Sequence, residues 1–310
     1  MIKLLSIIGQ KASYVLILGL VLAAFLPILS ILLRPALPFF VSLVLGLAIA
    51  RLDVLHIIQE FMEWKKSLLL AGIVVLFMPA TCIIIVCIWR QFDLDDSYIL
   101  LLVVFAASPP LSSATSLSLL LGYNSRLTLQ VTLLATLFLP ILGPLCFSIV
   151  GLNLDLEMLV QALRIAIMIF GGFLLGICIQ IALGKGNIER NKDAFNGVVT
   201  LAMILFLFPL FDGVFKYVFS APLQSFMIFI LAFILNIFGN LFIRWISKSG
   251  CSMQTANALG LMFGNRNLSF YLAVLPLNPL LSMFVATSQI PMFLTPTLFR
   301  EQPPKLDKFR

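Results

Sequence analysis

The feature that most constrains the fold is a series of apolar runs, each long enough to cross a membrane, that fills nearly the whole chain. A bilayer core is roughly 30 Å thick, so a helix needs about 20 apolar residues to span it. With 61% hydrophobic and 11% charged residues, these 310 residues do not resemble a soluble domain. We therefore expect an all-α membrane protein with ten transmembrane helices, at residues 12–33, 36–52, 67–90, 98–121, 125–150, 156–183, 194–212, 222–246, 252–275 and 279–299.

The distribution of positive charge predicts how these helices are oriented. Of the 20 Lys and Arg residues, Arg164 and Arg266 lie well within expected helices, and the others lie in loops or near helix ends and divide unequally between the two sides of the membrane. Cytoplasmic loops carry an excess of Lys and Arg, so we expect both termini on the cytoplasmic side of an inner cell membrane. The richer side holds Lys3, Lys11, Arg51, Lys65, Lys66, Arg126, Lys185, Arg190, Lys192, Arg244, Lys248, Arg300, Lys305, Lys308 and Arg310, and the poorer side holds Arg34, Arg90 and Lys216.

Two expected helices are interrupted at equivalent places. The fourth breaks at 108–110 and the ninth at 264–267, and each is the fourth in a set of five. Because five is odd, two such sets insert with opposite orientations, which is the inverted-repeat plan of many secondary transporters. We expect repeats at 1–150 and 151–310, with the two broken helices crossing near the midplane, where irregular backbone is buried in protein or lines a cavity. The alternative is that the prolines only kink packed helices.

Polar residues around the two breaks are the candidate solute-binding groups. Arg266 lies inside the second break, and a charged side chain near the bilayer centre costs about 2.5 to 3.5 kcal/mol on insertion scales, so it needs partners. Since every Asp and Glu falls in a loop or at a helix end, Arg266 either contacts an anionic solute or is an internal counter-charge for free carbonyl groups. The full candidate set is Arg266, Asn265, Asn267, Ser112, Ser113 and Thr115.

Other polar residues within expected helices have two alternative roles each. Thr128 and Thr132 are four positions apart, hence on one helix face, and with Thr115 they are candidate ion ligands. Polar contact between helices is the alternative for both threonines. Arg164 is expected to extend to the membrane interface rather than to bind solute. The five cysteines have no metal-ligand spacing, so no metal site is predicted.

These residues give the chain a resemblance to the bile acid:sodium symporter family and its prokaryotic relatives, along essentially its whole length. Residues 77–79 (Phe-Met-Pro) are similar to that family's Met-Pro element. Residues 108–110, with the span that follows as far as Pro140, are similar to its first crossover, and 264–268 with 272–273 to its Gln-Asn crossover. The resemblance implies a core of spans 3–5 and 8–10 that moves against a panel of spans 1, 2, 6 and 7, and a solute that is an organic anion taken up with sodium.

The sodium ligands that the resemblance implies are replaced here. The family's ligating Glu falls on Met262, and the Gln of the Gln-Asn pair falls on Arg266. A further Gln falls on Val74, and an Asn after the first crossover falls on Thr115. Because the guanidinium would repel sodium, we expect it to take the place of the bound cation, so that coupling to sodium is lost.

The leading hypothesis is a secondary transporter that moves a small organic anion by alternating access without sodium. A sodium-dependent symporter with a reduced site is the runner-up, and a transport-inactive membrane sensor or partner subunit is the alternative from another class. We expect no enzyme, because no Ser/His or paired-Asp arrangement is present and the single histidine, His56, lies in a loop. The expected partners are the solute and the lipid bilayer, with no cofactor and no nucleic acid; the oligomeric state is left open.

Overall fold

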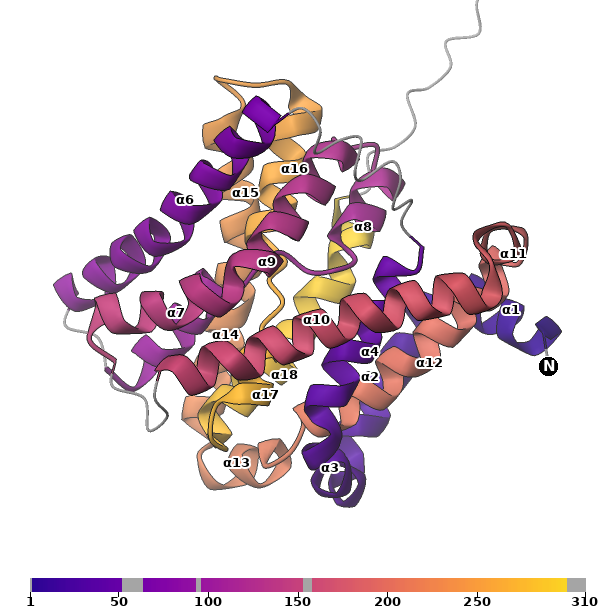
Figure 1. Cartoon of the computed structure of the whole chain (residues 1–310). Coiled ribbons are helices and arrows are strands. Elements are labelled where there is room, and N and C mark those ends of the chain that lie inside the picture. The colour runs from indigo at the N-terminus through magenta and orange to yellow at the C-terminus, as the bar shows by residue number, and fades with distance from the viewer. Residues whose placement is uncertain (1, 52–63, 93–95, 153–157, 300–310) are drawn as a thin grey trace, which may run out of the picture.

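The structure is a computed structural model of the whole chain, and it describes residues 2–51, 64–92, 96–152 and 158–299. His56 lies outside these ranges. Every element within them is helical (Figure 1). The elements are α1 (Ile2–Gln10), α2 (Ala12–Phe25), α3 (Pro27–Leu33), the 3-10 turn η1 (Arg34–Ala36), α4 (Leu37–Ile49), α6 (Trp64–Gln91), the 3-10 turn η2 (Asp96–Tyr98), α7 (Ile99–Ala107), α8 (Ala114–Leu120), α9 (Ser125–Val150), α10 (Met158–Leu183), α11 (Lys185–Arg190), α12 (Lys192–Leu210), α13 (Val214–Ser220), α14 (Pro222–Phe233), the π-helical turn η3 (Ile234–Phe238), α15 (Gly239–Ser247), α16 (Met253–Gly264), α17 (Ser269–Val274) and α18 (Pro279–Leu298).

The protein is a multi-span helical membrane protein. Within the described part of the chain, 6 helices are long and apolar enough to cross a bilayer, or up to 7 if a bent pair at the N-terminus counts as one span. Fewer than the expected ten qualify, because the expected fourth and ninth helices are divided into the shorter helices α7, α8, α16 and α17. The last apolar helix, Pro279–Thr295, is also shorter than these six.

The N-terminal region differs from the expected spans. The expected helix 12–33 is interrupted at Leu26, where Pro27 begins α3 and restricts the residue before it to a non-helical conformation. One candidate span instead runs from Pro27 to Ile49, across the expected boundary between the first two helices. An additional helix, α1, precedes this region and is bent by 89° from Tyr14–Phe25.

The helices pack in two groups. In one group, α4 lies along α10, and α12 packs on α1, α2, α3 and α4; in the other, α6 packs on α7 and α9, α15 on α16, and α14 on α18 (Figure 1). Close approach of α4 and α10 requires glycine, since a Cβ atom on Gly176 would lie 2.7 Å from the carbonyl oxygen of Gly46. Contacts of α9 with α10 and of α17 with α4 join the two groups.

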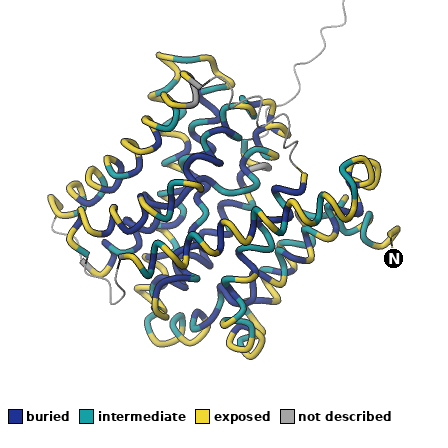
Figure 2. The backbone as a smooth tube through the Cα atoms, in the orientation of Figure 1, coloured by how far each residue is buried: buried dark blue, intermediate teal, exposed yellow. Residues whose placement is uncertain are grey.

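Residues on the outer faces of the helices are exposed (Figure 2). Many of them are apolar, as expected for contact with lipid tails. On α10, Leu163, Ile167, Phe170 and Leu174 follow a helical spacing and are all exposed. The interior holds a set of buried polar residues that includes both helix breaks. Polar groups inside a membrane are costly and commonly functional, so the two breaks are the candidate functional site.

Candidate functional site

The first break is produced by its own sequence. α7 ends at Ala107, Ser108 is extended (φ −75°, ψ 142°), and α8 begins only at Ala114. Proline has no N–H to continue a helix, and it disfavours helical backbone in the residue before it. Pro109 and Pro110 therefore end α7 inside the protein, where both residues are buried.

The second break contains no proline and is paired with the first. α16 ends at Gly264, and α17 begins at Ser269. The N–H of Leu111 donates to the Asn265 carbonyl at 2.8 Å, and the N–H of Asn267 donates to the Pro109 carbonyl at 2.8 Å. These bonds flank an antiparallel bridge between Pro110 and Arg266. The two interruptions thus satisfy backbone groups that would be costly to bury unpaired.

Arg266 is held within the protein by carbonyl groups and aromatic rings. Its side chain is only 3% exposed. Nη1 donates to the Ser108 carbonyl at 2.8 Å, and Nε donates to the Phe263 carbonyl at 3.0 Å. The guanidinium carbon also lies 5.1 Å from the ring centre of Phe263 and 5.9 Å from that of Phe105. Such contacts stabilise a buried cation, and they correspond to the internal counter-charge role.

Asn265 is engaged by neighbouring helices. Its Nδ2 donates to the Leu261 carbonyl at 3.2 Å, and its Oδ1 accepts from Thr295 Oγ1 at 3.2 Å. Asn236, in the π-helical turn η3, donates from Nδ2 to the Gly264 carbonyl at 2.6 Å and to Asn265 Oδ1 at 3.5 Å. Asn236 was not predicted as a site residue, although an asparagine within an apolar span indicates polar contact between helices.

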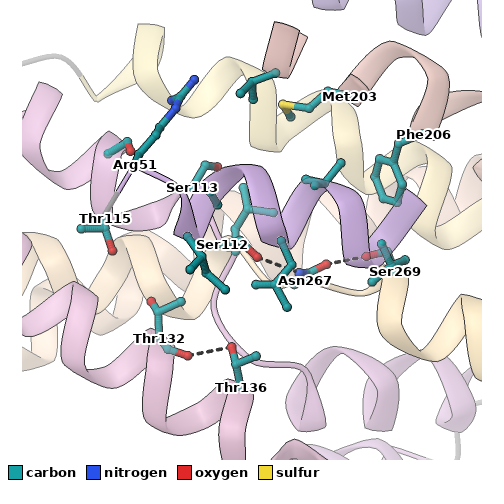
Figure 3. Close-up of a pocket in the computed structure, with 18 of the residues that line it drawn as sticks. Arg51, Ser112, Ser113, Thr115, Thr132, Thr136, Met203, Phe206, Asn267 and Ser269 are labelled. Atoms are coloured by element: carbon teal, nitrogen blue, oxygen red, sulfur yellow. Dashed lines mark hydrogen bonds between the residues drawn. The ribbon is translucent and has the colours of Figure 1, made fainter. Parts of the chain in front are cut away.

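A cavity of about 100 Å³ lies where the breaks face the other group of helices (Figure 3). One wall comes from the breaks, α9 and α18, and the opposite wall comes from α4, α10 and α12. One water molecule requires only about 10 to 15 Å³ of such cavity volume, so the cavity is large enough for a small solute. The polar lining residues are Arg51, Ser112, Ser113, Thr115, Ser116, Thr132, Thr136, Asn267, Ser269 and Gln289.

A short chain of hydrogen bonds orients the amide in this cavity. Ser269 Oγ donates to Asn267 Oδ1 at 2.5 Å, and Asn267 Nδ2 donates to Ser112 Oγ at 3.2 Å (Figure 3). Thr132 is buried and lines the cavity, yet its Oγ1 has no hydrogen-bond partner in the described part of the chain. Buried polar atoms normally have partners, so an unpaired hydroxyl here is unusual, and the atom itself is enclosed by protein.

The structure separates the predicted site residues into two sets. Ser112, Ser113, Thr115, Thr132 and Asn267 line the cavity, whereas Asn265, Arg266 and Thr128 are not among the lining residues. Thr128 Oγ1 instead lies 2.8 Å from Ser118 Oγ, and it also donates to the Asn124 carbonyl at 3.0 Å. Thr115, Thr128 and Thr132 therefore do not share one face of the cavity in this conformation.

Five polar lining residues were not in the predicted set: Arg51, Ser116, Thr136, Ser269 and Gln289. Arg51 follows the end of α4, and its guanidinium carbon lies 5.4 Å from the ring centre of Phe195. It was counted only among the charges on the richer side of the membrane. Ser269 and Gln289 also line the cavity, and their polar types within apolar helices were the available signal.

Comparison of the sequence with models of protein families and with curated proteins finds no match.

Proposed function

We propose that this protein is a secondary transporter of a small organic anion, working by alternating access. In this proposal the chain has ten spans arranged as two inverted repeats, 1–150 and 151–310, with the architecture of the bile acid:sodium symporter family. The support is that two broken helices, each fourth in its set of five, pair through their interrupted backbone. Discontinuous helices at a repeat interface commonly form transporter sites.

The observation that carries the proposal is the position of the cavity. Its walls come from the two groups of helices, which correspond to the proposed core of spans 3–5 and 8–10 and the proposed panel of spans 1, 2, 6 and 7. If one group moves relative to the other, a solute held at the breaks passes from one side of the membrane to the other. A cavity enclosed within one rigid group would not support such a mechanism.

The lining chemistry favours a small anion with an apolar part. Arg51 is the charged member of the lining set, and hydroxyl and amide groups at the first break and on α17 supply hydrogen bonds. Apolar residues, among them Phe173, Phe206 and Phe293, complete the walls. We assign the solute contacts to Ser112, Ser113, Thr115, Asn267 and Arg51, and we assign Arg266 and Asn265 to holding the breaks in place.

Transport without sodium is supported by the surroundings of Arg266. Its guanidinium already neutralises the Ser108 and Phe263 carbonyls. Met262, at the position of the family's sodium-ligating carboxylate, is a buried thioether. Because the guanidinium already binds these carbonyl groups, a metal cation is not required to neutralise them, and its positive charge disfavours a metal cation beside it.

The test is uptake of a panel of short carboxylated solutes by the purified protein in liposomes, with and without sodium or pH gradients. We expect uptake of at least one solute that does not respond to sodium. Replacing Arg51 with Gln should weaken the apparent affinity for that solute roughly tenfold, because a charge-assisted contact is lost. Lys248→Gln, which removes an exposed cation from the same predicted side, is the matched control and should leave uptake unchanged.

Each alternative predicts a different result in this assay. Stimulation by sodium would favour a symporter that uses Thr115, Thr128 and Thr132. Solute binding without flux would favour a transport-inactive sensor or partner subunit. Combining Met262→Glu with Arg266→Gln restores two of the four replaced family positions, and we expect this double variant to gain a response to sodium.

A further inference from the structure

The end of α17 carries carbonyl groups that accept hydrogen bonds from arginines. α17 has 6 residues and is followed by extended backbone at Leu275. The last carbonyl groups of a helix lack partners within the helix, so they depend on outside donors. Arg34 Nη2 donates to the Leu272 carbonyl at 3.0 Å, and Arg164 Nη1 makes a longer contact of 3.5 Å with the Val274 carbonyl.

Both arginines belong to the group of helices on the other side of the cavity. Arg34 lies in η1, directly before α4, and Arg164 lies in the second turn of α10. Arg34 Nη1 also donates to the Pro209 carbonyl of α12 at 3.4 Å. Two cations therefore connect α4, α10 and α12 to α17, whose residue Ser269 lines the cavity.

These contacts lie at the end of α4 that is remote from Arg51. α4 has 13 residues, so its two ends are about 20 Å apart. α10 runs parallel to α4, since Ser42 Oγ donates to the Met168 carbonyl at 3.0 Å and Gly46 meets Gly172 and Gly176 further along. The start of α10, with Arg164, is consequently at the Arg34 end. Arg51 lines the cavity at the opposite end of α4.

We propose that Arg34 and Arg164 form a gate that closes one side of the cavity by holding the carbonyl end of α17, and that these contacts break when the cavity opens to that side. The proposal rests on the alternating-access function. The positive charge distribution predicts that this gate faces away from the cytoplasm. Side-chain donors from one group to backbone acceptors on the other suit this role, because such bonds separate without rearranging either helix.

The test measures access to the cavity from each side of the membrane. A reporter thiol is introduced by Ser113→Cys, at a cavity-lining hydroxyl, and labelled in sealed vesicles of known orientation with a membrane-impermeant maleimide. The five native cysteines remain, and labelling at position 113 is quantified by peptide mass. In the otherwise unchanged protein we expect the thiol to react mainly from the side of Arg51. Combining Arg34→Gln with Arg164→Gln should increase labelling from the opposite side roughly tenfold, because charge-assisted bonds are lost.

Two control variants separate gating from a general loss of packing. Arg34→Lys with Arg164→Lys keeps both charges. Its labelling from the gate side should lie between that of the parent and that of the double Gln variant. Arg90→Gln removes a similar bond, from Arg90 Nη2 to the Val150 carbonyl at 3.3 Å, but this bond lies within one group of helices, between α6 and the end of α9. Labelling in Arg90→Gln should match the parent. Elution as a single folded species confirms that each variant is intact.

The outcomes distinguish the gate from the transport function. Unchanged labelling from the gate side in the folded double Gln variant overturns the gate, and so does an equal increase in Arg90→Gln. Labelling requires no solute, so the gate is tested even if no solute is taken up by liposomes. Uptake without any gate response would leave the transport function standing and remove this inference alone.

Discussion

The two helix breaks pair with one another but differ in what produces them. The first, at 108–113, contains two consecutive prolines, so its departure from helix is dictated locally. The second, at 265–268, has no proline, and it is held by backbone pairing with the first and by the side chains of Asn265 and Arg266. The first interruption is therefore intrinsic to its segment, whereas the second depends on contacts with distant parts of the chain.

The largest change in stability should come from Arg266→Met, which tests what holds the second break. The variant leaves the carbonyl groups of Ser108 and Phe263 without their donor, and each unpaired buried group costs about 1 to 3 kcal/mol. We expect the free energy of unfolding in detergent to decrease by about 2 to 6 kcal/mol. The free energy of unfolding of Arg266→Lys should lie between those of Arg266→Met and the parent. Denaturant titration followed by tryptophan fluorescence measures the change. Equal stability of Arg266→Met and the parent would show that this side chain is not what holds the second break.

A smaller effect is expected for Asn265→Leu, which keeps the volume of the side chain but removes its hydrogen bonds. Leu261, Thr295 and Asn236 lose a partner, and we expect destabilisation by about 2 to 3 kcal/mol in the same titration. The matched control is Asn187→Leu, at an exposed amide on α11, which should change stability by less than about 0.5 kcal/mol. If the two variants were equally stable, the second break would depend on its backbone pairing alone.

The smallest effect is expected for Pro109→Ala. Alanine gives the unfolded chain more freedom, which costs about 1 kcal/mol or less, but the Pro109 carbonyl can still accept from Asn267. The measurement is hydrogen exchange at the Leu111 amide, which pairs with the Asn265 carbonyl and should remain protected. Pro110 remains in this variant and still cannot continue a helix. Rapid exchange at the Leu111 amide would show that Pro110 alone does not maintain the first break, and the contrast between the two breaks would be sharper.

Several features of the fold were predictable because they depend on short stretches of sequence. Long apolar runs indicated membrane helices, and among the described residues six to seven helices are long and apolar enough to cross a bilayer. The positions of both interruptions were also predicted, since Pro109 and Pro110 cannot continue a helix and polar residues cluster at 264–267. The kink before Pro27 was missed, although proline was again the signal.

The site was predicted only in part, because the lining of a cavity is a property of several helices at once. Ser112, Ser113, Thr115, Thr132 and Asn267 reach the cavity as expected for polar residues at the breaks. Thr128, four positions from Thr132, turns instead to Ser118, so helical spacing alone did not determine which threonines share the cavity. Arg51 reaches it from another helix, and a charge count could not place it there.

By itself, the sequence determined that the protein lies in a lipid bilayer, that its backbone is helical and where two of its helices are interrupted. Only the tertiary structure decided that the breaks pair with each other, that Arg266 binds carbonyl groups, and that Arg34 and Arg164 reach the end of α17. The physical reason is distance along the chain: Asn267 and Ser112 are 155 positions apart, and Arg266 and Ser108 are 158 apart. Local propensity acts over a few residues, while these bonds form only once the helices have packed.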